Sequence, residues 1–394
     1  VNFTPQTDKS AKGVLSPFQA FMTGLAASVG TGNIAGVATA VVAGGPGAVF
    51  WIWAYGFVAT VIKLSEATLG VRYRKVEDGK LSAGPSHYLR DGLGSPKLAW
   101  IYALVAGVAA LTTTPFTQPN SIAVVFESEF GISTWISGVV LAIMAWLVII
   151  GGVRSIGRAA ERIAPTMVIL YLVGGTIVIL VNFSQIPAVL RLIFTEAFSL
   201  ESAGGGLLGT GMMMAVRYGL ARGIYANEAG YGTAAVAYGT AQSAKPVQQG
   251  MNAMMEVYIV SFVTSSISAL TILVSGVWDS GLNSTALVAQ AFESSMPFGG
   301  VVVALCALLF GYSTLIGWGY YGEQYLGFLF GDWVIKPYRW IYCALVVLGA
   351  MTKVELVWAW GDLMNGLQIF PNLIGVLGLS GIVAGLLGKH SRKS

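Results

Sequence analysis

Residues 16–40 read SPFQAFMTGLAASVGTGNIAGVATA, an apolar run long enough to cross a bilayer. The centre of this run, residues 29–36 (VGTGNIAG), holds three glycines, a threonine and an asparagine, which interrupt a helix. Backbone that is not helical is costly in hydrocarbon unless it lines a polar cavity, so we interpret the run as a broken membrane helix with a ligand site at its break. Two alternatives are weaker. Gly32 and Gly36 form a GxxxG that could serve helix packing, and the glycine spacing fits a dinucleotide-binding fingerprint poorly.

The composition of the whole chain is that of an integral membrane protein. Of its 394 residues, 55% are hydrophobic and 10% are charged, whereas an ordinary soluble domain carries about 25% charged residues. So few charges cannot solubilise the chain, which excludes a soluble enzyme. The apolar runs are long and do not alternate, so they predict helices and not barrel strands. The two cysteines, Cys306 and Cys343, have no metal-binding spacing.

Ten apolar runs are long enough to span a bilayer, and they predict an all-α polytopic membrane protein with a single transmembrane domain over 1–394. The runs lie at 16–44, 46–71, 98–126, 134–152, 159–182, 206–241, 247–277, 298–330, 337–352 and 370–388. Two further segments, 186–200 and 355–367, are too short or too mixed to span. We expect both to be amphipathic helices at the membrane surface.

The basic residues indicate how the chain is oriented in the plasma membrane. With a cytoplasmic N-terminus, seventeen of the 22 Lys and Arg residues fall in inner segments and three fall within spans. Only two, Arg191 and Lys353, fall in outer segments. Because basic residues accumulate on the cytoplasmic side, we expect both termini to face the cytoplasm. An eleventh crossing at 355–367 would move the basic C-terminal tail outside and is rejected on that ground.

The sixth run is interrupted in the same way as the first. Residues 206–241 would form a helix about 54 Å long, against a hydrocarbon core of about 30 Å, and glycines and charges punctuate the part between Arg217 and Gly232. Spans one and six occupy matching positions if the chain consists of two five-helix repeats, 16–182 and 206–388. An odd number of spans then places the repeats in opposite orientations. Matching broken helices in two such halves point to a transporter with its binding site near the membrane midplane.

Three motifs resemble a known family. Residues 16–40, RGIYANEAGYGTAA (222–235) and GYSTLIGWGYYGE (311–323) resemble the alanine or glycine:cation symporters, and the resemblance extends from about residue 14 to about residue 388. This family is related to the LeuT-like inverted-repeat transporters. The resemblance implies a LeuT-like 5+5 inverted repeat with broken helices 1 and 6. It also implies a transporter, not an enzyme, that takes up a small neutral amino acid, alanine or glycine, with sodium by alternating access.

The resemblance further implies a sodium site between spans one and eight. Matched residue by residue, its ligands are the carbonyls of Ala26, Val29 and Phe310 and the hydroxyls of Ser313 and Thr314. Five neutral oxygens suit a monovalent cation such as Na⁺, whereas a divalent ion normally needs carboxylates. Taken without the resemblance, the two hydroxyls are better explained by bonds to carbonyls of their own helix.

We expect the amino acid to lie between the two breaks. The exposed N–H groups of a half-helix attract a carboxylate, and freed carbonyls accept hydrogen bonds from an ammonium group. The substrate carboxylate is therefore predicted to meet N–H groups of span one, and the ammonium group to meet carbonyls of span six. The residues concerned are Gly30, Thr31, Gly32 and Asn33 in span one, and Gly223, Ile224 and Tyr225 in span six.

Three further side chains are expected at the substrate site. Gln118 lies between Pro115 and Pro119 in the middle of span three, where lipid does not tolerate a polar amide, so we assign it to the substrate. The alternative is that it satisfies carbonyls freed by the two prolines. Trp318 and Phe116 are expected to wall the pocket, although membrane aromatics often serve packing only. A small pocket would favour alanine, glycine or serine.

Charged residues within the spans suggest a gate. Lys63 and Glu66 are three apart on one helical face, so we expect a structural pair or a lysine that snorkels to the surface. Arg222 and Glu228 flank the break in span six and could form an inner gate with Glu66 or Glu323. Rocking of spans one, two, six and seven against spans three, four, eight and nine would make and break such a gate.

Other functions are less well supported. A proton-coupled carrier of the same fold would place a titratable side chain, commonly lysine, at the first-span cation site, and Ser313 and Thr314 argue against it. A channel would need a symmetric filter-like segment, and the sequence shows none. A histidine-based intramembrane enzyme is excluded because His87 and His390 lie outside the spans. The expected partners are a small neutral amino acid, sodium and the bilayer, with no nucleic acid; stoichiometry and oligomeric state stay open.

Overall fold

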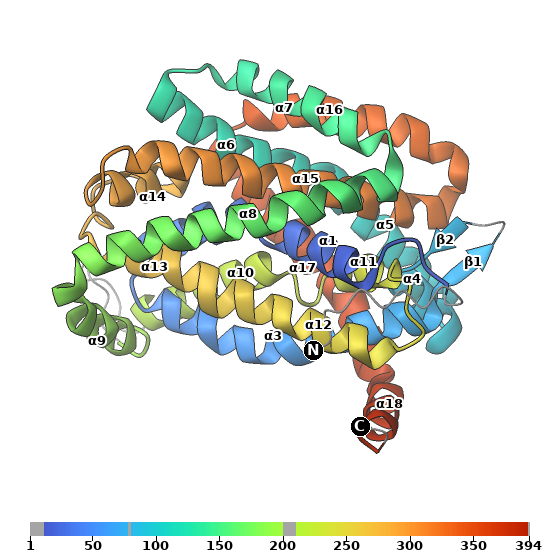
Figure 1. Cartoon of the computed structure of the whole chain (residues 1–394). Helices are drawn as coiled ribbons and strands as arrows, with labels where there is room; N and C mark the ends of the chain where they lie inside the picture. The colour runs from blue at the N-terminus through green and yellow to red at the C-terminus, as the bar shows by residue number, and fades with distance from the viewer. Residues whose placement is uncertain (1–11, 78–79, 200–209, 393–394) are drawn as a thin grey trace.

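A computed structural model of the chain describes residues 12–77, 80–199 and 210–392. These residues form helices joined by short connections, with one two-stranded hairpin among them (Figure 1). In chain order the elements are α1 (Pro17–Ser28), η1 (Thr31–Asn33), α2 (Ala35–Gly44), α3 (Ala48–Tyr73), β1 (Lys75–Glu77), β2 (Lys80–Ser82), α4 (Pro85–His87), η2 (Tyr88–Gly92), α5 (Pro96–Thr112), α6 (Thr114–Phe130), α7 (Thr134–Ile149), α8 (Gly152–Val181), η3 (Phe183–Gln185), α9 (Ile186–Glu196), α10 (Thr210–Asn227), α11 (Thr233–Gly239), α12 (Pro246–Val257), η4 (Tyr258–Thr264), α13 (Ser265–Val274), α14 (Ser284–Glu293), α15 (Gly299–Phe330), η5 (Asp332–Val334), α16 (Ile335–Ala350), α17 (Val354–Gly378) and α18 (Ser380–Ser391).

The first predicted span is a broken helix. α1 begins with a capping box, in which the Ser16 hydroxyl accepts from the backbone N–H of Gln19 and the Gln19 side chain accepts from the backbone N–H of Ser16. The helix ends at Ser28, and the chain continues through η1 into α2 at an angle of 54°. The break predicted from the glycines of this run is confirmed.

Each of the ten predicted spans corresponds to a helix or to a broken helix pair. Among the described residues, five helices are long and apolar enough to cross a membrane, or seven if each of two bent pairs counts as one span. These seven are spans one, two, three, five, seven, eight and ten. Spans four and nine fall on α7 and α16, which have 16 residues each. Span six falls on α10 and α11, of 18 and 7 residues, and its first predicted residues, 206–209, lie outside the described residues.

The helices pack in two groups (Figure 1). α3 lies along α12 and α10, and together with α1, α2 and α11 these helices form a group drawn from spans one, two, six and seven. α15 is the centre of the second group, where it packs against α5, α6, α8 and α14, and α7 and α16 cover α6. α1 also packs against α8 and α15, so the first half of the broken first span lies between the groups.

The tenth span begins earlier than predicted. Residues 355–367 are not a surface helix, because they belong to α17, which runs without interruption from Val354 to Gly378. One face of α17 is buried and carries polar side chains, among them Asn365, Gln368 and Asn372. Of these, Asn365 lies within 355–367, where it, Glu355 and Asp362 weaken the apolar signal of the segment. α18 follows α17 at a bend of 54°.

The connections between spans contain both predicted and unpredicted elements. α9 forms the short helix predicted at 186–200. The hairpin of β1 and β2, the turn of α4 and η2, and α14 were not predicted. The hairpin and α4 lie at one end of the molecule, and α9 and α14 lie at the opposite end (Figure 1). Arg74, which ends α3, donates to the carbonyls of Gly239, Ala241 and Ser243 and so ties the hairpin end to the loop before α12.

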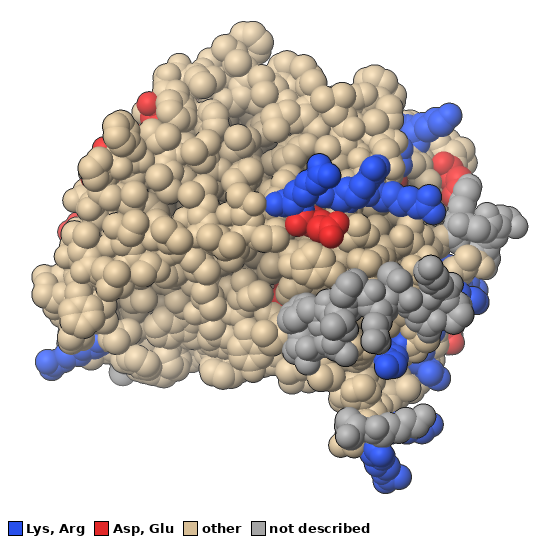
Figure 2. Space-filling model, viewed as in Figure 1, with Lys and Arg blue, Asp and Glu red and all other residues tan. Residues whose placement is uncertain are grey.

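The basic side chains are unevenly distributed. Figure 2 shows Lys and Arg concentrated towards the end of the molecule that carries the hairpin, while most of the remaining face is uncharged. Arg154, Arg158 and Arg162 follow one face of α8 at intervals of four residues, and all three are exposed. Large apolar side chains such as Phe57 and Ile169 are 65% and 61% exposed, which suits contact with lipid. The orientation inferred from the basic residues, with both termini in the cytoplasm, stays a prediction.

Candidate functional site

Four of the five predicted sodium ligands are linked by a chain of three hydrogen bonds. Ser313 Oγ is 2.8 Å from the Ala26 carbonyl oxygen in α1 and 3.0 Å from the Phe310 carbonyl oxygen in its own helix. Thr314 Oγ1 is 3.2 Å from the same Ala26 oxygen. These residues and Val29, the fifth predicted ligand, are all buried. The group joins the last turn of α1 to the middle of α15 through neutral oxygens, which suit Na⁺ better than a divalent ion.

Carboxylate-rich metal sites are not found elsewhere in the part of the chain that the structure describes. No three His, Cys, Asp or Glu residues there lie together in a way that could hold a metal ion. The neutral-oxygen group between α1 and α15 is the cation site that the sequence predicted, and it stays a candidate on the geometry given above.

Gln118 of α6 contacts the break in span one. Its Oε1 accepts from the backbone N–H of Thr31 at 3.0 Å and from the Thr31 hydroxyl at 2.9 Å. Gly30 lies between Gln118 and Thr314, and a Cβ at this position would be 2.6 Å from Thr314 Oγ1 and 3.1 Å from Gln118 Oε1. Only glycine fits this approach of three spans. The predicted sodium residues and substrate residues therefore adjoin at Gly30.

A small cavity lies between the breaks of spans one and six. Its volume is about 10 Å³, which is about the room that one water molecule needs, so a ligand the size of alanine requires the walls to move apart. Of the predicted residues, six line it: Gly30, Gly32, Gln118, Tyr225, Trp318 and Thr314. The lining also includes residues that the sequence did not assign to the substrate: Ala27, Ser28, Thr113, Thr114, Glu228, Tyr231 and Asn365.

Asn33 faces span seven and not the cavity. Its Oδ1 accepts from the Thr264 hydroxyl at 3.3 Å and from the Ser265 hydroxyl at 3.1 Å, and its Nδ2 donates to the Ser28 carbonyl at 3.0 Å. The side chain thus closes the break of span one and fastens it to η4 and α13. Thr31 is likewise fully buried and bound to Gln118.

Three other predicted substrate residues lie away from the cavity. The carbonyls of Gly223 and Ile224 are not freed, because α10 continues to Asn227, and the Ile224 oxygen accepts from the N–H of Glu228 at 2.8 Å. Gly223 faces α3, where a Cβ would lie 3.4 Å from the nearest atom. Phe116 is half-buried outside the cavity lining. The sequence placed the break in span six too early, because Gly219 and Gly223 allow α10 to pack closely on α3 and do not end the helix.

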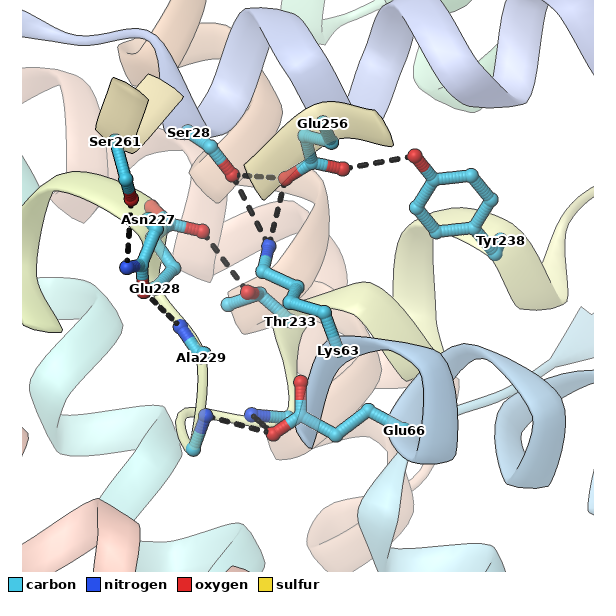
Figure 3. Close-up of polar contacts among 12 residues, drawn as sticks. Ser28, Lys63, Glu66, Asn227, Glu228, Ala229, Thr233, Tyr238, Glu256 and Ser261 are labelled. Atoms are coloured by element: carbon cyan, nitrogen blue, oxygen red, sulfur yellow. Dashed lines mark hydrogen bonds and ion pairs between the residues drawn. The ribbon is translucent and has the colours of Figure 1, made fainter. Parts of the chain in front are cut away.

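The break in span six falls at residues 228–232. The φ angles are +57° at Glu228, +96° at Gly230 and +83° at Gly232, and a positive φ is uncommon for a residue with a side chain. The Glu66 carboxylate of α3 holds this turn, because its Oε1 accepts from the N–H groups of Gly230 at 2.9 Å and Gly232 at 3.1 Å (Figure 3). Asn372 of α17 donates to the same oxygen at 2.7 Å.

Glu228 brings a carboxylate to the cavity wall. Its Oε1 accepts from Trp318 Nε1 of α15 at 2.6 Å, and its Oε2 accepts from the Thr233 hydroxyl at 2.8 Å. The residue is only 4% exposed. Sequence reasoning considered Glu228 for a gate, but an acidic residue inside a glycine-interrupted membrane span is itself the signal of a ligand site.

Lys63 neither pairs with Glu66 nor snorkels, so both predictions for it are wrong. Its Nζ lies 2.7 Å from Glu256 Oε1 of α12 and 3.1 Å from Ser28 Oγ at the end of α1 (Figure 3). Ser28 also donates to Glu256, and the Tyr238 hydroxyl donates to the second Glu256 oxygen at 2.8 Å. A fully buried ion pair thus joins α3, α12 and α11 to the break in span one. Its partners are 193 residues apart in the chain, so spacing could not reveal it.

The predicted inner gate is replaced by two separate ion pairs. Arg222 donates to both oxygens of Asp362 in α17, at 2.7 and 2.8 Å, and lies over the Trp358 ring at 4.5 Å. This pair lies in the half of span six that precedes the break. Glu323, near the hairpin end of α15, pairs with Arg339 of α16 at 2.6 Å. Neither pair involves the partner that the sequence suggested.

A larger cavity of about 710 Å³ lies at the hairpin end of the molecule. Ser82 of the hairpin, Arg154 at the start of α8 and the Glu323–Arg339 pair help to line it. Tyr320 also lines it, two residues along α15 from Trp318, which lines the small cavity. Two residues along a helix lie about 3 Å apart along its axis, so α15 contributes neighbouring side chains to both cavities.

Two broken helices that meet at a buried cavity beside a neutral-oxygen site define a secondary transporter of the LeuT-like fold. Solved structures agree. MhsT in complex with L-phenylalanine matches with a TM-score of 0.58 and 13% identity over 95% of this chain and 99% of that chain. A mutant of the manganese transporter of Eremococcus coleocola matches with a TM-score of 0.59 and 13% identity over 97% of this chain and 83% of that chain. At this identity the similarity shows the fold alone.

The chain belongs to the sodium:alanine symporter family, whose family model matches residues 1–394. The sodium/alanine symporter AgcS of Methanococcus maripaludis is 38% identical over 390 residues, which are 97% of this chain and 85% of AgcS. The amino-acid carrier protein AlsT of Bacillus subtilis is 32% identical over 374 residues, 94% of this chain and 79% of AlsT. The chain is therefore a membrane transport protein of an amino-acid symporter family.

Proposed function

We propose that the protein is a symporter that uses sodium to import a small neutral amino acid, such as alanine or glycine, across the plasma membrane. The observation that carries this proposal is the adjacency of the neutral-oxygen site to the small cavity. Thr314 belongs to both, because its hydroxyl lies 3.2 Å from the Ala26 carbonyl and the residue also lines the cavity. The family and the relative AgcS support sodium and alanine.

Sodium would act by linking the two helix groups. Ala26 belongs to the group of spans one, two, six and seven, and Ser313 and Thr314 belong to the group around α15. A cation bound by both draws α1 onto α15 and so completes the wall of the substrate cavity at Gly30. Rocking of the first group against spans three, four, eight and nine would then open the cavity towards the larger cavity at the hairpin end.

The substrate carboxylate would bind at the break in span one. Thr31 gives its N–H to Gln118, but the N–H of Gly32 and the Nε2 of Gln118 have no hydrogen-bond partner among the described residues. Both residues line the cavity. α2 begins directly after this turn, and the positive end of a helix dipole favours a negative group. These two donors are the ones we assign to the carboxylate.

The walls of the cavity would limit the side chain of the substrate. Trp318 is held by Glu228 at 2.6 Å, and Tyr225 packs against Trp358 with ring centroids 5.0 Å apart. Trp318 and Tyr225 line the cavity and leave little free volume. Alanine, glycine and serine would need only a small outward shift of these rings, whereas a larger side chain would need them to leave their places.

Sodium entry supplies enough energy for accumulation. One ion that moves inward through 100 mV releases about 2.3 kcal/mol. At about 1.4 kcal/mol per tenfold ratio, this supports roughly fifty-fold accumulation of the amino acid per ion. The sodium concentration gradient adds to this figure.

The test is uptake of labelled alanine into proteoliposomes. We expect uptake to require a sodium gradient and to stop when potassium replaces sodium at fixed pH. Thr314→Ala should raise the sodium concentration for half-maximal uptake about tenfold or more, because the variant loses one of the oxygens that bind the sodium ion. Thr112→Ala is the matched control, since the Thr112 hydroxyl bonds to Val108 of its own helix at 2.8 Å. Uptake that ignores sodium, or a Thr314→Ala variant with unchanged sodium dependence, would refute the proposal.

One observation keeps proton coupling as a second candidate. A buried lysine, Lys63, lies 3.1 Å from Ser28 at the break in span one, and a titratable lysine near this break is what a proton-coupled carrier of this fold would use. The same proteoliposomes separate the two functions. An inward pH gradient without sodium should drive no alanine uptake if sodium is the coupling ion, and should drive it if protons are.

A further inference from the structure

We propose that Glu228 and Asn365 form the subsite for the substrate's ammonium group. In this arrangement a buried carboxylate supplies the negative charge that selects amino acids over simple carboxylic acids, beside the neutral carbonyls at the end of α10. The inference deepens the proposed function and rests on it. It concerns two acceptors that line the same cavity as Gly32 and Gln118, the donors that we assign to the substrate carboxylate.

Glu228 forms no direct ion pair among the described residues, although Lys63 attracts it from a longer distance. Its two oxygens accept from neutral donors, Trp318 Nε1 at 2.6 Å and the Thr233 hydroxyl at 2.8 Å. The buried lysine of the same region gives its contacts to Glu256 and Ser28 (Figure 3). An ionised carboxylate in a membrane interior is costly unless a cation compensates it. Because Glu228 lines the cavity, that cation can be part of a ligand.

The backbone of the break in span six is already engaged. Four consecutive carbonyls, at residues 228–231, each accept a hydrogen bond, the first from within the turn and the other three from side chains of other helices. The Glu228 carbonyl accepts from the N–H of Tyr231 at 3.1 Å, and the Ala229 carbonyl accepts from the Tyr55 hydroxyl at 2.8 Å. The Gly230 carbonyl accepts from Asn372 Nδ2 at 2.8 Å. The Tyr231 carbonyl accepts from the Tyr102 hydroxyl at 2.6 Å and from Gln368 Nε2 at 2.8 Å. An ammonium group with three N–H donors therefore cannot rely on this turn. Only the last carbonyls of α10, at residues 225–227, remain at the end of a helix.

Asn365 supplies a second, independent indication. Its Oδ1 is buried and has no hydrogen-bond partner among the described residues, the residue is only 4% exposed, and it lines the same cavity. Buried acceptors in proteins are nearly always satisfied, so an N–H from a ligand is the natural partner. Asn365 belongs to α17 and Glu228 to the break in span six, so the two acceptors reach the cavity from different spans. The negative end of the α10 dipole favours a cation at the same place.

The backbone at Glu228 supports a ligand role. Its φ of +57° lies in a region that side chains rarely adopt. Such conformations persist where the surroundings enforce them, and they cluster at ligand sites. The alternative is that Glu228 only positions Trp318, which would make it a structural residue. The experiment must therefore separate recognition of the ammonium group from maintenance of the cavity.

The test compares alanine with propionate, which has the same carboxylate and methyl group but no ammonium. Both are titrated in sodium buffer onto the purified full chain, with propionate as a competitor of labelled alanine. We expect Glu228→Gln to weaken alanine binding about tenfold to a hundredfold, because a charge-assisted contact becomes a neutral one, and to leave propionate binding unchanged. Asn365→Leu should weaken alanine binding several-fold, again without effect on propionate. A purely structural role would weaken both ligands in the same proportion.

Glu66→Gln is the matched control. Glu66 holds the same turn through Gly230 and Gly232 but does not line the cavity, so this variant should keep the alanine-to-propionate ratio of the wild type. If Glu228→Gln does not fold, Glu228→Asp is tested in its place. This variant keeps the charge but retracts it by one methylene, so it should weaken the binding of alanine and not that of propionate. A wild type without sodium-dependent alanine binding would refute the proposed function. The ammonium subsite would be overturned if the wild type binds alanine and the Glu228 variants keep the wild-type ratio of alanine affinity to propionate affinity.

Discussion

Replacing Lys63 by methionine should strongly destabilise the protein. Lys63 and Glu256 are 1% and 0% exposed and 2.7 Å apart, and the variant leaves the Glu256 carboxylate with hydrogen bonds from Ser28 and Tyr238 alone. Removal of one member of a buried ion pair costs about 3–5 kcal/mol. A loss of about 3 kcal/mol already lowers the ratio of folded to unfolded protein more than a hundredfold.

The second variant removes both charges. Because neutral, well-packed replacements of a buried pair cost little, Lys63→Met with Glu256→Gln should recover about 2 kcal/mol or more of the loss. The free energy of unfolding is measured by titrating SDS into mixed micelles and following tryptophan fluorescence. Lys75→Met is the control, since Lys75 pairs with Asp91 at 3.3 Å with side chains 40% and 30% exposed, and such surface pairs contribute about 1 kcal/mol or less. A Lys63→Met variant as stable as the wild type, or a double variant no more stable than the single one, would refute the reasoning.

Three further outcomes are expected. Asp362→Asn should slow alanine uptake in proteoliposomes and lower the unfolding free energy by less than Lys63→Met does, because the variant leaves Arg222, only 3% exposed, without its carboxylate, whereas Asp362 is 37% exposed and partly reached by solvent. Gly30→Ala should abolish alanine binding by titration calorimetry, since its Cβ would lie 2.6 Å from a buried hydroxyl, whereas Gly366→Ala, with no atom within 4 Å, should bind normally. Burial and the nearby Arg90 hold the pKa of His87 at about 4, below its ordinary 6.5. His87 therefore contributes stability above about pH 6.5 that is lost as the pH falls towards 4, and His87→Gln should flatten the unfolding free energy over that interval.

The sequence predicted the architecture well where hydrophobic length and glycine breaks carry the information. The break after Ser28 was found because Gly30 and Gly32 interrupt an otherwise apolar run. In span six the same reasoning failed locally. Gly219 and Gly223 resemble breaks in sequence, but they are contact points with α3, where a Cβ at Gly219 would clash with the Ala48 carbonyl. A glycine alone does not reveal whether it ends a helix or lets another helix approach.

The candidate site was predicted only in part, because its side chains come from distant spans. Gln118 could be found from its polar amide in the middle of an apolar span, and it does contact the first break. Asn365 could not be found, because it lies in a segment whose polarity suggested a surface helix. Lys63 and Glu66 are neighbours on one helix but have different partners, Glu256 for the lysine and the backbone of span six for the glutamate. Such long-range pairings require the fold.

The turn at residues 228–232 is held in shape from outside, by side chains of three other helices. They are Glu66 and Tyr55 of α3, Tyr102 of α5, and Gln368 and Asn372 of α17. A ligand therefore meets a preorganised wall, and little of its binding free energy is lost to ordering the protein. The same arrangement makes affinity vulnerable at a distance, since substitutions that loosen any of these helices would weaken binding without touching the ligand. Variation in affinity among related transporters could thus arise from helix packing while the residues around the ligand stay the same.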